Sequence, residues 1–214
     1  MPDSIERAVS GRAKCRGCGR VICKGDLRLG EALPNPYGEG EAVYWFHLPC
    51  AACMRPDKTL AVLQGAPEPM PDHAWLERTA QAGIVHRRLA RLARVERAPS
   101  GRARCRQCHA FVDHGVWRIA LHIFEEGRFS PLGCIHVGCS EAYFGTSEIL
   151  DRIRRLTPDL GDDDAALIEQ LLSAPPAALP SDGGLRKTQA ETPIDDADDA
   201  DSDEPDVRDR RTAG

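Results

Sequence analysis

Apolar positions along the chain fall into short runs, and their spacing predicts small structural elements rather than one extended sheet or bundle. Alternation and aromatic content predict short strands at 27–29, 42–46 and 116–121. Apolar residues that recur every three or four positions predict helices at 56–64, 72–97, 147–156 and 162–173. Gly83 weakens the middle of the longest of these helices, and Pro67, Pro69 and Pro71 interrupt the chain before it.

One stretch of sequence occurs twice. Residues 6–18 read ERAVSGRAKCRGC and residues 96–108 read ERAPSGRARCRQC, with ten of thirteen positions identical at an offset of 90. The predicted strand at 116–121 also lies 90 residues after the one at 27–29. The chain therefore contains two copies of one module.

Each copy pairs a Cys-x-x-Cys turn with a later His-x-x-Cys. The intervening gaps are similar, 28 residues in the first copy and 27 in the second. Zinc prefers four thiolate or imidazole ligands in a tetrahedron, and four protein ligands leave no open position for catalysis. The spacing predicts two structural Zn²⁺ ions, each held by three cysteines and one histidine: Cys15, Cys18, His47 and Cys50; Cys105, Cys108, His136 and Cys139.

Other interpretations of these residues remain open. The Cys-x-x-Cys turns could form redox dithiols, although the βαβ surroundings typical of such motifs are missing. Cys53 lies three residues after Cys50 and could replace it as a ligand. Cys23 and Cys134 have no counterpart in the other copy and are predicted to be small buried residues. The equally unmatched histidines are predicted to lie on the surface or in packing: His109, His114 and His122.

Composition and charge favour small metal-stabilised modules inside the cell. Only 5% of the residues are aromatic, which is little for one large core, and small domains commonly use metals for stability. The N-terminus has no apolar signal segment, and no apolar run approaches the ~20 residues of a membrane span. The net charge of −5 hides an acidic segment at 181–214, with 11 acidic and 5 basic residues, and an arginine-rich stretch at 86–108.

The combined motif resembles the zinc finger of poly(ADP-ribose) polymerases, which also occurs in DNA ligase III. The first copy carries SGRAKCRGC, KGDLRLG and YWFHLPC, and the second carries SGRARCRQC, GVWRIA and CIHVGC. The similarity covers roughly residues 5–55 and 95–145. It implies an α+β finger with a small antiparallel sheet and a helix, and it implies recognition of DNA strand breaks.

Basic residues beside a metal-locked turn can meet phosphates at little ordering cost, and arginine adds a bidentate fork. Lys14, Arg16, Arg104 and Arg106 are candidates on this ground; the alternative is a solvated basic face. The resemblance implies phosphate contacts at Arg12 and Arg28, and at Arg102 and Arg118. It also implies base-stacking apolar residues in the loop between the ligand pairs, where the chain offers Tyr37, Val43, Phe124 and Phe129.

We expect a first finger at 5–65, a helical basic linker at 66–97, a second finger at 98–146, C-terminal helices at 147–174 and a disordered acidic tail at 175–214. We expect no enzyme activity, because no nucleophile–base pair or phosphate-binding glycine motif is present. The leading hypothesis is a protein that binds broken DNA together with repair-protein partners, in the cytoplasm or nucleoid of a bacterium or in a eukaryotic nucleus. The alternatives are a protein-interaction adaptor, a generic DNA binder and a thiol oxidoreductase.

Overall fold

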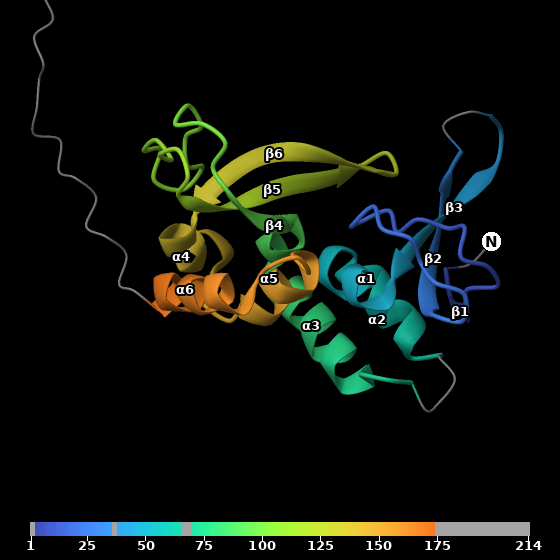
Figure 1. Cartoon of the computed structure of the whole chain (residues 1–214). Coiled ribbons are helices and arrows are strands. Elements are labelled where there is room, and N and C mark those ends of the chain that lie inside the picture. The colour runs from blue at the N-terminus through green and yellow to red at the C-terminus, as the bar shows by residue number, and fades with distance from the viewer. Residues whose placement is uncertain (1–2, 36–37, 66–69, 174–214) are drawn as a thin grey trace, which may run out of the picture. The chain divides into compact units, whose positions relative to one another are not determined.

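The computed structural model describes residues 3–35, 38–65 and 70–173. The first module is built on a three-stranded antiparallel sheet in the order β1-β2-β3 (Figure 1). Its strands are β1 (Ser4–Arg7), β2 (Leu27–Pro34) and β3 (Glu41–His47). The strands predicted at 27–29 and 42–46 are confirmed, and β1 was not predicted because its four residues are too few to show alternation.

Two short helices continue directly from β3. α1 (Leu48–Met54) begins with a proline in its first turn, where the missing N–H is not needed, and six of its seven residues are buried. α2 (Pro56–Leu63) starts in the same way and confirms the helix predicted at 56–64. α1 thereby places buried apolar surface behind the metal-ligand positions at the end of β3.

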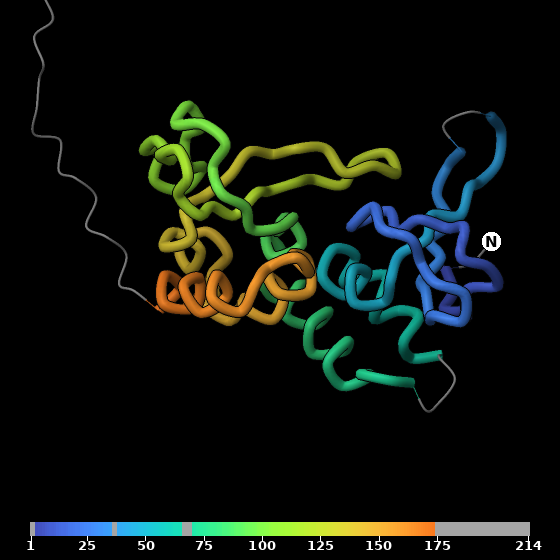
Figure 2. Tube along the Cα trace, viewed as in Figure 1, coloured from blue at the N-terminus to red at the C-terminus, as the bar shows by residue number. Residues whose placement is uncertain are grey.

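The second module repeats this sheet in the order β4-β5-β6. Its strands are β4 (Leu92–Arg97), β5 (Trp117–Glu125) and β6 (Arg128–His136), and the trace in Figure 2 shows β5 and β6 as a long hairpin. Glu126 and Gly127 turn the hairpin with φ of 50° and 74°, the left-handed geometry of a tight turn whose twist matches the strands. The sequence predicted only part of β5 and did not predict β6.

The helix predicted over 72–97 is wrong in its second half. The structure has α3 (His73–Val85), a 3₁₀ segment η1 (Arg87–Arg91) and then strand β4. Leu92 and Val95 are both buried although they lie three residues apart, because the pairing with β5 shifts between Leu92 and Arg94. This bulge imitates helical spacing within a strand. The "linker" therefore contributes the first strand of the second sheet.

The C-terminal part is helical. η2 (Val137–Cys139) and α4 (Ser140–Phe144) follow β6, and α5 (Leu150–Leu156) and α6 (Asp162–Ser173) follow them. The helix predicted at 162–173 is confirmed, whereas the one predicted at 147–156 begins at Leu150. The disorder predicted for 175–214 concerns residues outside the described part of the chain.

The buried residues of both modules belong to one apolar cluster. Phe46 of β3 meets Phe124 and Phe129 of the β5–β6 hairpin, with ring centroids 6.3 and 6.4 Å apart. Arg152 of α5 donates from Nη1 to the carbonyl of Cys53 at 2.8 Å. The two sheets are thus joined by side-chain packing as well as by the connecting chain.

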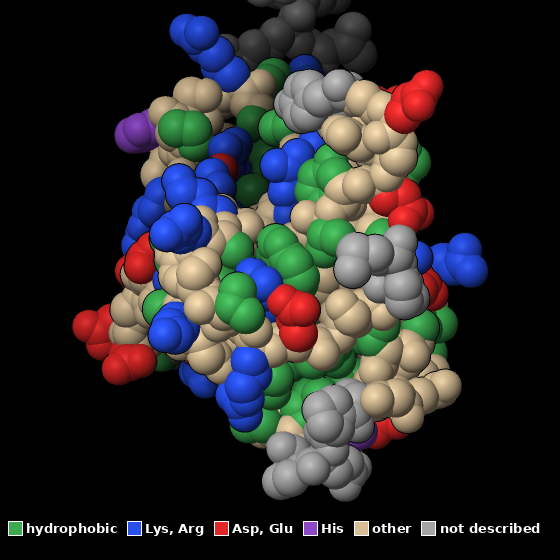
Figure 3. Space-filling view, turned by 90° about the vertical axis from the view of Figure 1, so that its right-hand side faces the viewer, with side chains coloured by type: hydrophobic (Ala, Val, Ile, Leu, Met, Phe, Trp, Pro, Cys, Tyr) green, Lys and Arg blue, Asp and Glu red, His purple; other side chains and the backbone are tan. Residues whose placement is uncertain are grey.

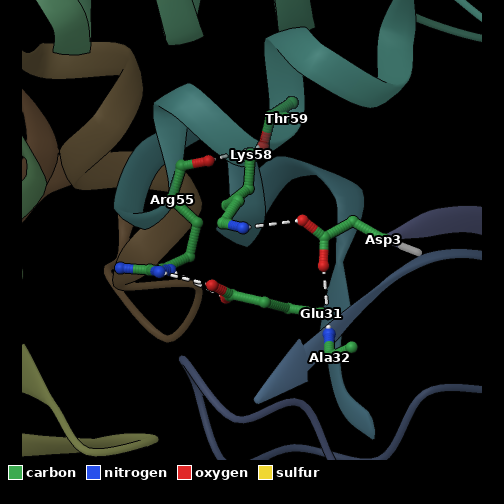
Figure 4. Close-up of polar contacts among 6 residues, drawn as sticks. All are labelled: Asp3, Glu31, Ala32, Arg55, Lys58 and Thr59. Carbon is green, nitrogen blue, oxygen red and sulfur yellow. Dashed lines mark hydrogen bonds and ion pairs between the residues drawn. The ribbon is translucent and has the colours of Figure 1, made fainter. Parts of the chain in front are cut away.

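Two ion pairs near the start of α2 involve residues of, or next to, the first sheet: Glu31 of β2 pairs with Arg55, and Asp3, just before β1, pairs with Lys58 (Figure 4). Glu31 is fully buried, and its two carboxylate oxygens accept hydrogen bonds from Nε of Arg55, at 2.8 Å, and from Nη2 of the same guanidinium. The carboxylate of Asp3 accepts a bond from Lys58 at 2.8 Å and another from the backbone N–H of Ala32 at 3.0 Å. The Arg55 guanidinium also lies 4.0 Å from the centroid of the Phe124 ring, so it links the first sheet to the second hairpin.

Candidate metal centres and nucleic-acid interface

The first metal-ligand group gathers residues from three elements. Cys15 and Cys18 lie on a loop closed by bonds of 2.8 Å from the Cys15 N–H to the Arg20 carbonyl and from the Gly19 N–H to the Cys15 carbonyl. His47 ends β3, and Cys50 lies in α1. One ligand atom from each of these four residues lies within 4.8 Å of the other three.

The His47 ring is oriented by its two nitrogens. Nδ1 faces the sulfurs, 3.4 Å from Cys18 Sγ and 3.9 Å from Cys50 Sγ. Nε2 lies 3.2 Å from the carbonyl of Val21, to which its N–H donates. A metal-bound histidine commonly donates its other ring N–H to a carbonyl in this way, which fixes the tautomer and leaves Nδ1 free to bind the ion.

The second group has the same geometry 89 or 90 residues later, with Cys105, Cys108, His136 and Cys139 within the same 4.8 Å. His136 Nδ1 lies 3.3 Å from Cys108 Sγ and 3.9 Å from Cys139 Sγ, and Nε2 lies 3.1 Å from the carbonyl of Phe111. Burial raises the pKa of the Cys105 thiol, but neighbouring backbone N–H groups outweigh it and lower the pKa to about 7. This environment favours the thiolate that a metal requires.

Both groups fit zinc. Three sulfurs and one imidazole nitrogen converge from fixed backbone positions, the donor set typical of a structural zinc site with four protein ligands. The chain therefore has two zinc sites, in agreement with the cofactor prediction. When bound, each ion cross-links the loop that carries the Cys-x-x-Cys turn (the knuckle loop), the last strand of the sheet and the helical turn that follows it. Zinc affinity therefore contributes directly to folding.

The remaining cysteines lie outside these groups. Cys53 is fully buried and is not part of the ligand group that contains Cys50, and burial raises the pKa of its thiol to about 11, so it is a neutral packing residue rather than a replacement for Cys50. Cys134 is buried as predicted. The prediction for Cys23 is wrong, because its side chain is exposed.

Four of the predicted phosphate contacts are free at the surface. They are exposed side chains on the two knuckle loops and form no ion pair with any residue in the described ranges: Arg12, Lys14, Arg102 and Arg106. Figure 3 shows one face of the molecule, on which lysine and arginine side chains gather with apolar side chains between them. These residues have the exposure that a phosphate contact needs.

Arg28 and Arg118 lie in a different environment from the one expected of phosphate contacts. Arg28 is 6% exposed, bonds Glu6 at 2.5 Å and stacks 3.5 Å from the Trp45 ring centroid. Arg118 repeats the pair with Glu96 at 2.6 Å. Each pair joins facing positions of adjacent strands in its sheet. Because a carboxylate already neutralises each guanidinium, both arginines stabilise the sheets.

Arg16 and Arg104 are exposed but partly engaged. Arg16 Nε donates to the Gly127 carbonyl at 2.8 Å and its guanidinium lies 4.9 Å from the Tyr44 ring centroid, so it connects the first knuckle to the second hairpin. Arg104 donates to the His109 carbonyl at 3.1 Å and lies over the Phe111 ring at 3.9 Å. Arg104 is therefore held in place beside the second zinc site with its charge still at the surface.

Three of the four predicted stacking residues lie in strands rather than in an exposed loop. Phe124 and Phe129 pair across β5 and β6, with ring centroids 4.7 Å apart, and pack against Phe46. Val43 is half-buried on β3. Tyr37 lies outside the described residues. The prediction that the two phenylalanines lie in a loop was wrong, because the segment between the two ligand pairs of the second finger forms a hairpin.

Comparison with known proteins agrees with this architecture. Two tandem zinc fingers, each with three cysteines and one histidine on a three-stranded sheet, define the class of the protein. Residues 6–87 match the family described as the poly(ADP-ribose) polymerase and DNA-ligase zinc-finger region. This part of the chain is therefore a zinc finger of that family, and the resemblance inferred from the sequence is confirmed, as is the α+β class.

A curated relative is poly(ADP-ribose) polymerase 1 of Gallus gallus, which is 26% identical over 133 residues. The alignment covers 56% of this chain and 13% of the polymerase, so this chain spans a small part of that relative. Throughout the described ranges, no helix is both long and apolar enough to cross a membrane.

The two Glu–Arg strand pairs were missed by the sequence reasoning. The signal was present, because Glu6 and Glu96 both begin the repeated segment and Arg28 and Arg118 both follow by 22 residues. A repeated acid–arginine spacing indicates a structural pair as readily as a phosphate contact. The role of Arg152 gave no such signal, because it depends on contacts across 73 and 99 residues.

Proposed function

We propose that the two zinc fingers bind DNA and prefer strand breaks over intact duplex. The observation that carries this proposal is the repeated exposure of Arg12 and Arg102 at equivalent positions of two metal-fixed loops. Free guanidinium groups with a fixed origin suit phosphate oxygens, to which arginine binds in a bidentate manner. The family of residues 6–87, named for a polymerase and a DNA ligase, supports the choice of DNA.

The surrounding charge supports the same ligand. Lys14 and Arg106 are also exposed near the zinc sites, whereas the acidic residues Glu6 and Glu96 are occupied by the structural arginines. Within the described part of the chain, Arg12, Lys14, Arg102 and Arg106 are thus left without an ion-pair partner. Such a surface binds a polyanion through release of condensed counterions, which makes affinity strongly salt-dependent.

The test is a binding titration of the full, zinc-loaded chain against labelled intact, nicked, gapped and blunt-ended duplexes at several salt concentrations. We expect tighter binding to nicked than to intact DNA. Arg12→Ala and Arg102→Ala should each weaken binding and reduce the salt slope by about 0.9 for each lost phosphate contact. Arg78→Ala, on the exposed side of α3, is the matched control and should leave both affinity and slope unchanged.

Zinc content is measured on every variant. Unchanged zinc with weaker binding supports a direct contact, whereas loss of zinc in Arg12→Ala or Arg102→Ala would assign these residues to folding. Equal affinity for nicked and intact duplex would remove the break preference and leave generic DNA binding. No binding by the zinc-loaded chain to any duplex would reject the proposal.

The finer parts of the function belong to the same proposal. The chain acts without its own DNA-processing chemistry, inside the cell, and passes a recognised break to a repair-protein partner. The part of this proposal that concerns chemistry is supported by the match, which is to a zinc-finger region and to 13% of the related polymerase.

A further inference from the structure

A protein that distinguishes broken DNA from intact duplex needs a surface that can contact the face of an unstacked base. The phenylalanines of the β5–β6 hairpin are committed to intramolecular packing, as described above. The exposed large apolar residues in the described ranges are Val9, Val21, Val85, Phe111, Val116 and Leu167. Of these, only Val21 and Phe111 occupy equivalent positions in the two fingers, 90 residues apart.

Both residues point outward from the knuckle loops. Val21 is 47% exposed and Phe111 is 51% exposed, while the next residue in each finger, Ile22 or Val112, is completely buried. Alternation along the loop therefore buries one apolar side chain and presents the other to solvent. The buried partner fixes the backbone from which the exposed side chain projects.

The zinc sites fix the same backbone from the other side. The carbonyls of Val21 and Phe111 accept the Nε2–H groups of the ligand histidines at 3.2 and 3.1 Å. The backbone of each exposed apolar residue is thus hydrogen-bonded directly to a metal-ligand histidine. Pre-ordering of this kind removes much of the entropic cost of using a side chain as a contact.

Each apolar residue is paired with a cation. Lys14 forms a β-bridge with Val21, and Arg104 forms the equivalent bridge with Phe111. In the second finger, the Arg104 guanidinium also stacks over the ring at 3.9 Å and is held by the His109 carbonyl at 3.1 Å. His109 adopts the left-handed φ of 63° that lets the loop present this carbonyl.

An aromatic ring beside a fixed guanidinium matches the two parts of a nucleotide at a break, the exposed base and its phosphate. Bases stack on aromatic side chains regardless of sequence, and arginine adds phosphate and cation–π contacts. An intact duplex hides its base faces, so it offers such a ring nothing to stack on. The apolar–cation pair is therefore suited to broken DNA.

We propose that Phe111, with Arg104 held over its ring, stacks on a base exposed at a strand break. Val21 makes a smaller apolar contact at the equivalent position of the first finger. This inference rests on the proposed function and adds to it the residues that read the break. The second finger, with the larger ring and the held guanidinium, contributes more to break preference than the first.

The test compares Phe111→Ala, Phe111→Trp and Val21→Ala with Val116→Ala, which removes another exposed apolar residue of the second finger. Affinity is measured for gapped and intact duplexes that carry a fluorescent base analogue at the gap terminus. Phe111→Ala should lower the affinity for gapped DNA by on the order of tenfold and leave intact-duplex affinity unchanged. It should also abolish the fluorescence change of the terminal base.

Phe111→Trp should retain the preference, Val21→Ala should lower it less, and Val116→Ala should not change it. A Phe111→Ala protein that keeps the wild-type preference and fluorescence change overturns this inference alone. A wild-type chain that does not distinguish gapped from intact DNA overturns the proposed break preference instead. Equal loss of affinity for both duplexes would also overturn the inference, because it would assign Phe111 to general binding or folding.

Discussion

Arg152 is the residue whose loss should most weaken the attachment of α5 to the first finger. It is 3% exposed, and its guanidinium donates to the Cys53 carbonyl at 2.8 Å and to the Thr79 carbonyl. The Cys53 carbonyl lies in the last turn of α1, where helix carbonyls have no intrahelical partner. Burial lowers the pKa of Arg152, yet arginine remains charged in proteins. No carboxylate in the described ranges pairs with it.

Replacing Arg152 by methionine keeps most of the apolar stem and removes both donors. The Cys53 carbonyl is then buried without a partner, which costs about 1–3 kcal/mol. The Thr79 carbonyl lies inside α3 and keeps its helical environment, so loss of its hydrogen bond from Arg152 adds about 1 kcal/mol or less. Removing a buried charge recovers part of its desolvation cost. We expect Arg152→Met to lower the free energy of unfolding by about 2–3 kcal/mol.

Urea unfolding of the full zinc-loaded chain measures this change, with zinc content determined on the same samples. Arg154→Met is the matched control on the same helix, because Arg154 is exposed and its ion pair with Glu169 spans 3.9 Å. The control should change the free energy of unfolding by less than about 0.5 kcal/mol. An Arg152→Met protein as stable as the control would refute the assignment of Arg152 as the link between α5 and the first finger.

Two further predictions concern the buried residues His122 and Gly83. Burial of His122 lowers its pKa to about 4 despite a bond from Nε2 to the Ala90 carbonyl, so the folded state binds fewer protons than the unfolded state between pH 4 and about 6.5. The free energy of unfolding should therefore fall by about 3 kcal/mol as the pH drops through this window. This pH-dependent loss should be smaller in His122→Phe, as measured by urea unfolding of the wild-type and variant proteins at matched zinc content. Gly83→Ala should destabilise the chain, although alanine normally improves a helix by about 1 kcal/mol, because the added Cβ would lie 2.9 Å from Pro56 Cβ; a gain in thermal midpoint would contradict this.

The metal sites were predictable because their information is local and repeated. Four ligands in each copy follow one spacing, and the duplication supplies a second, independent reading of it. The strand containing His47 was also predictable, since its aromatic run is continuous up to the ligand. By contrast, β4 was predicted as helix because a bulge places Leu92 and Val95 on one face. Local periodicity cannot distinguish a bulged strand from a helical turn.

The surface was less predictable than the metal sites because exposure depends on tertiary partners. Phe124 and Phe129 were expected to be available to DNA, but they meet Phe46, which lies about 80 residues earlier in the chain. Phe111 was not singled out, because a single apolar residue next to a knuckle carries no sequence signal. Its exposure follows only from the burial of Val112 in the finger core.

The arginines of the two fingers divide into two groups that a binding assay alone would confuse. Arg28 and Arg118 hold their sheets together through Glu6 and Glu96, and replacing either would leave a partly buried carboxylate without its partner. Loss of DNA binding in such a variant would follow from local unfolding near the zinc ligand His47 or His136, since each arginine pairs with that histidine across the sheet. Arg12 and Arg102 have no such partner among the residues that the structure describes, so their loss removes charge without removing support. A contact role can therefore be assigned only to arginines whose substitution lowers the salt slope while zinc content and unfolding midpoint stay constant.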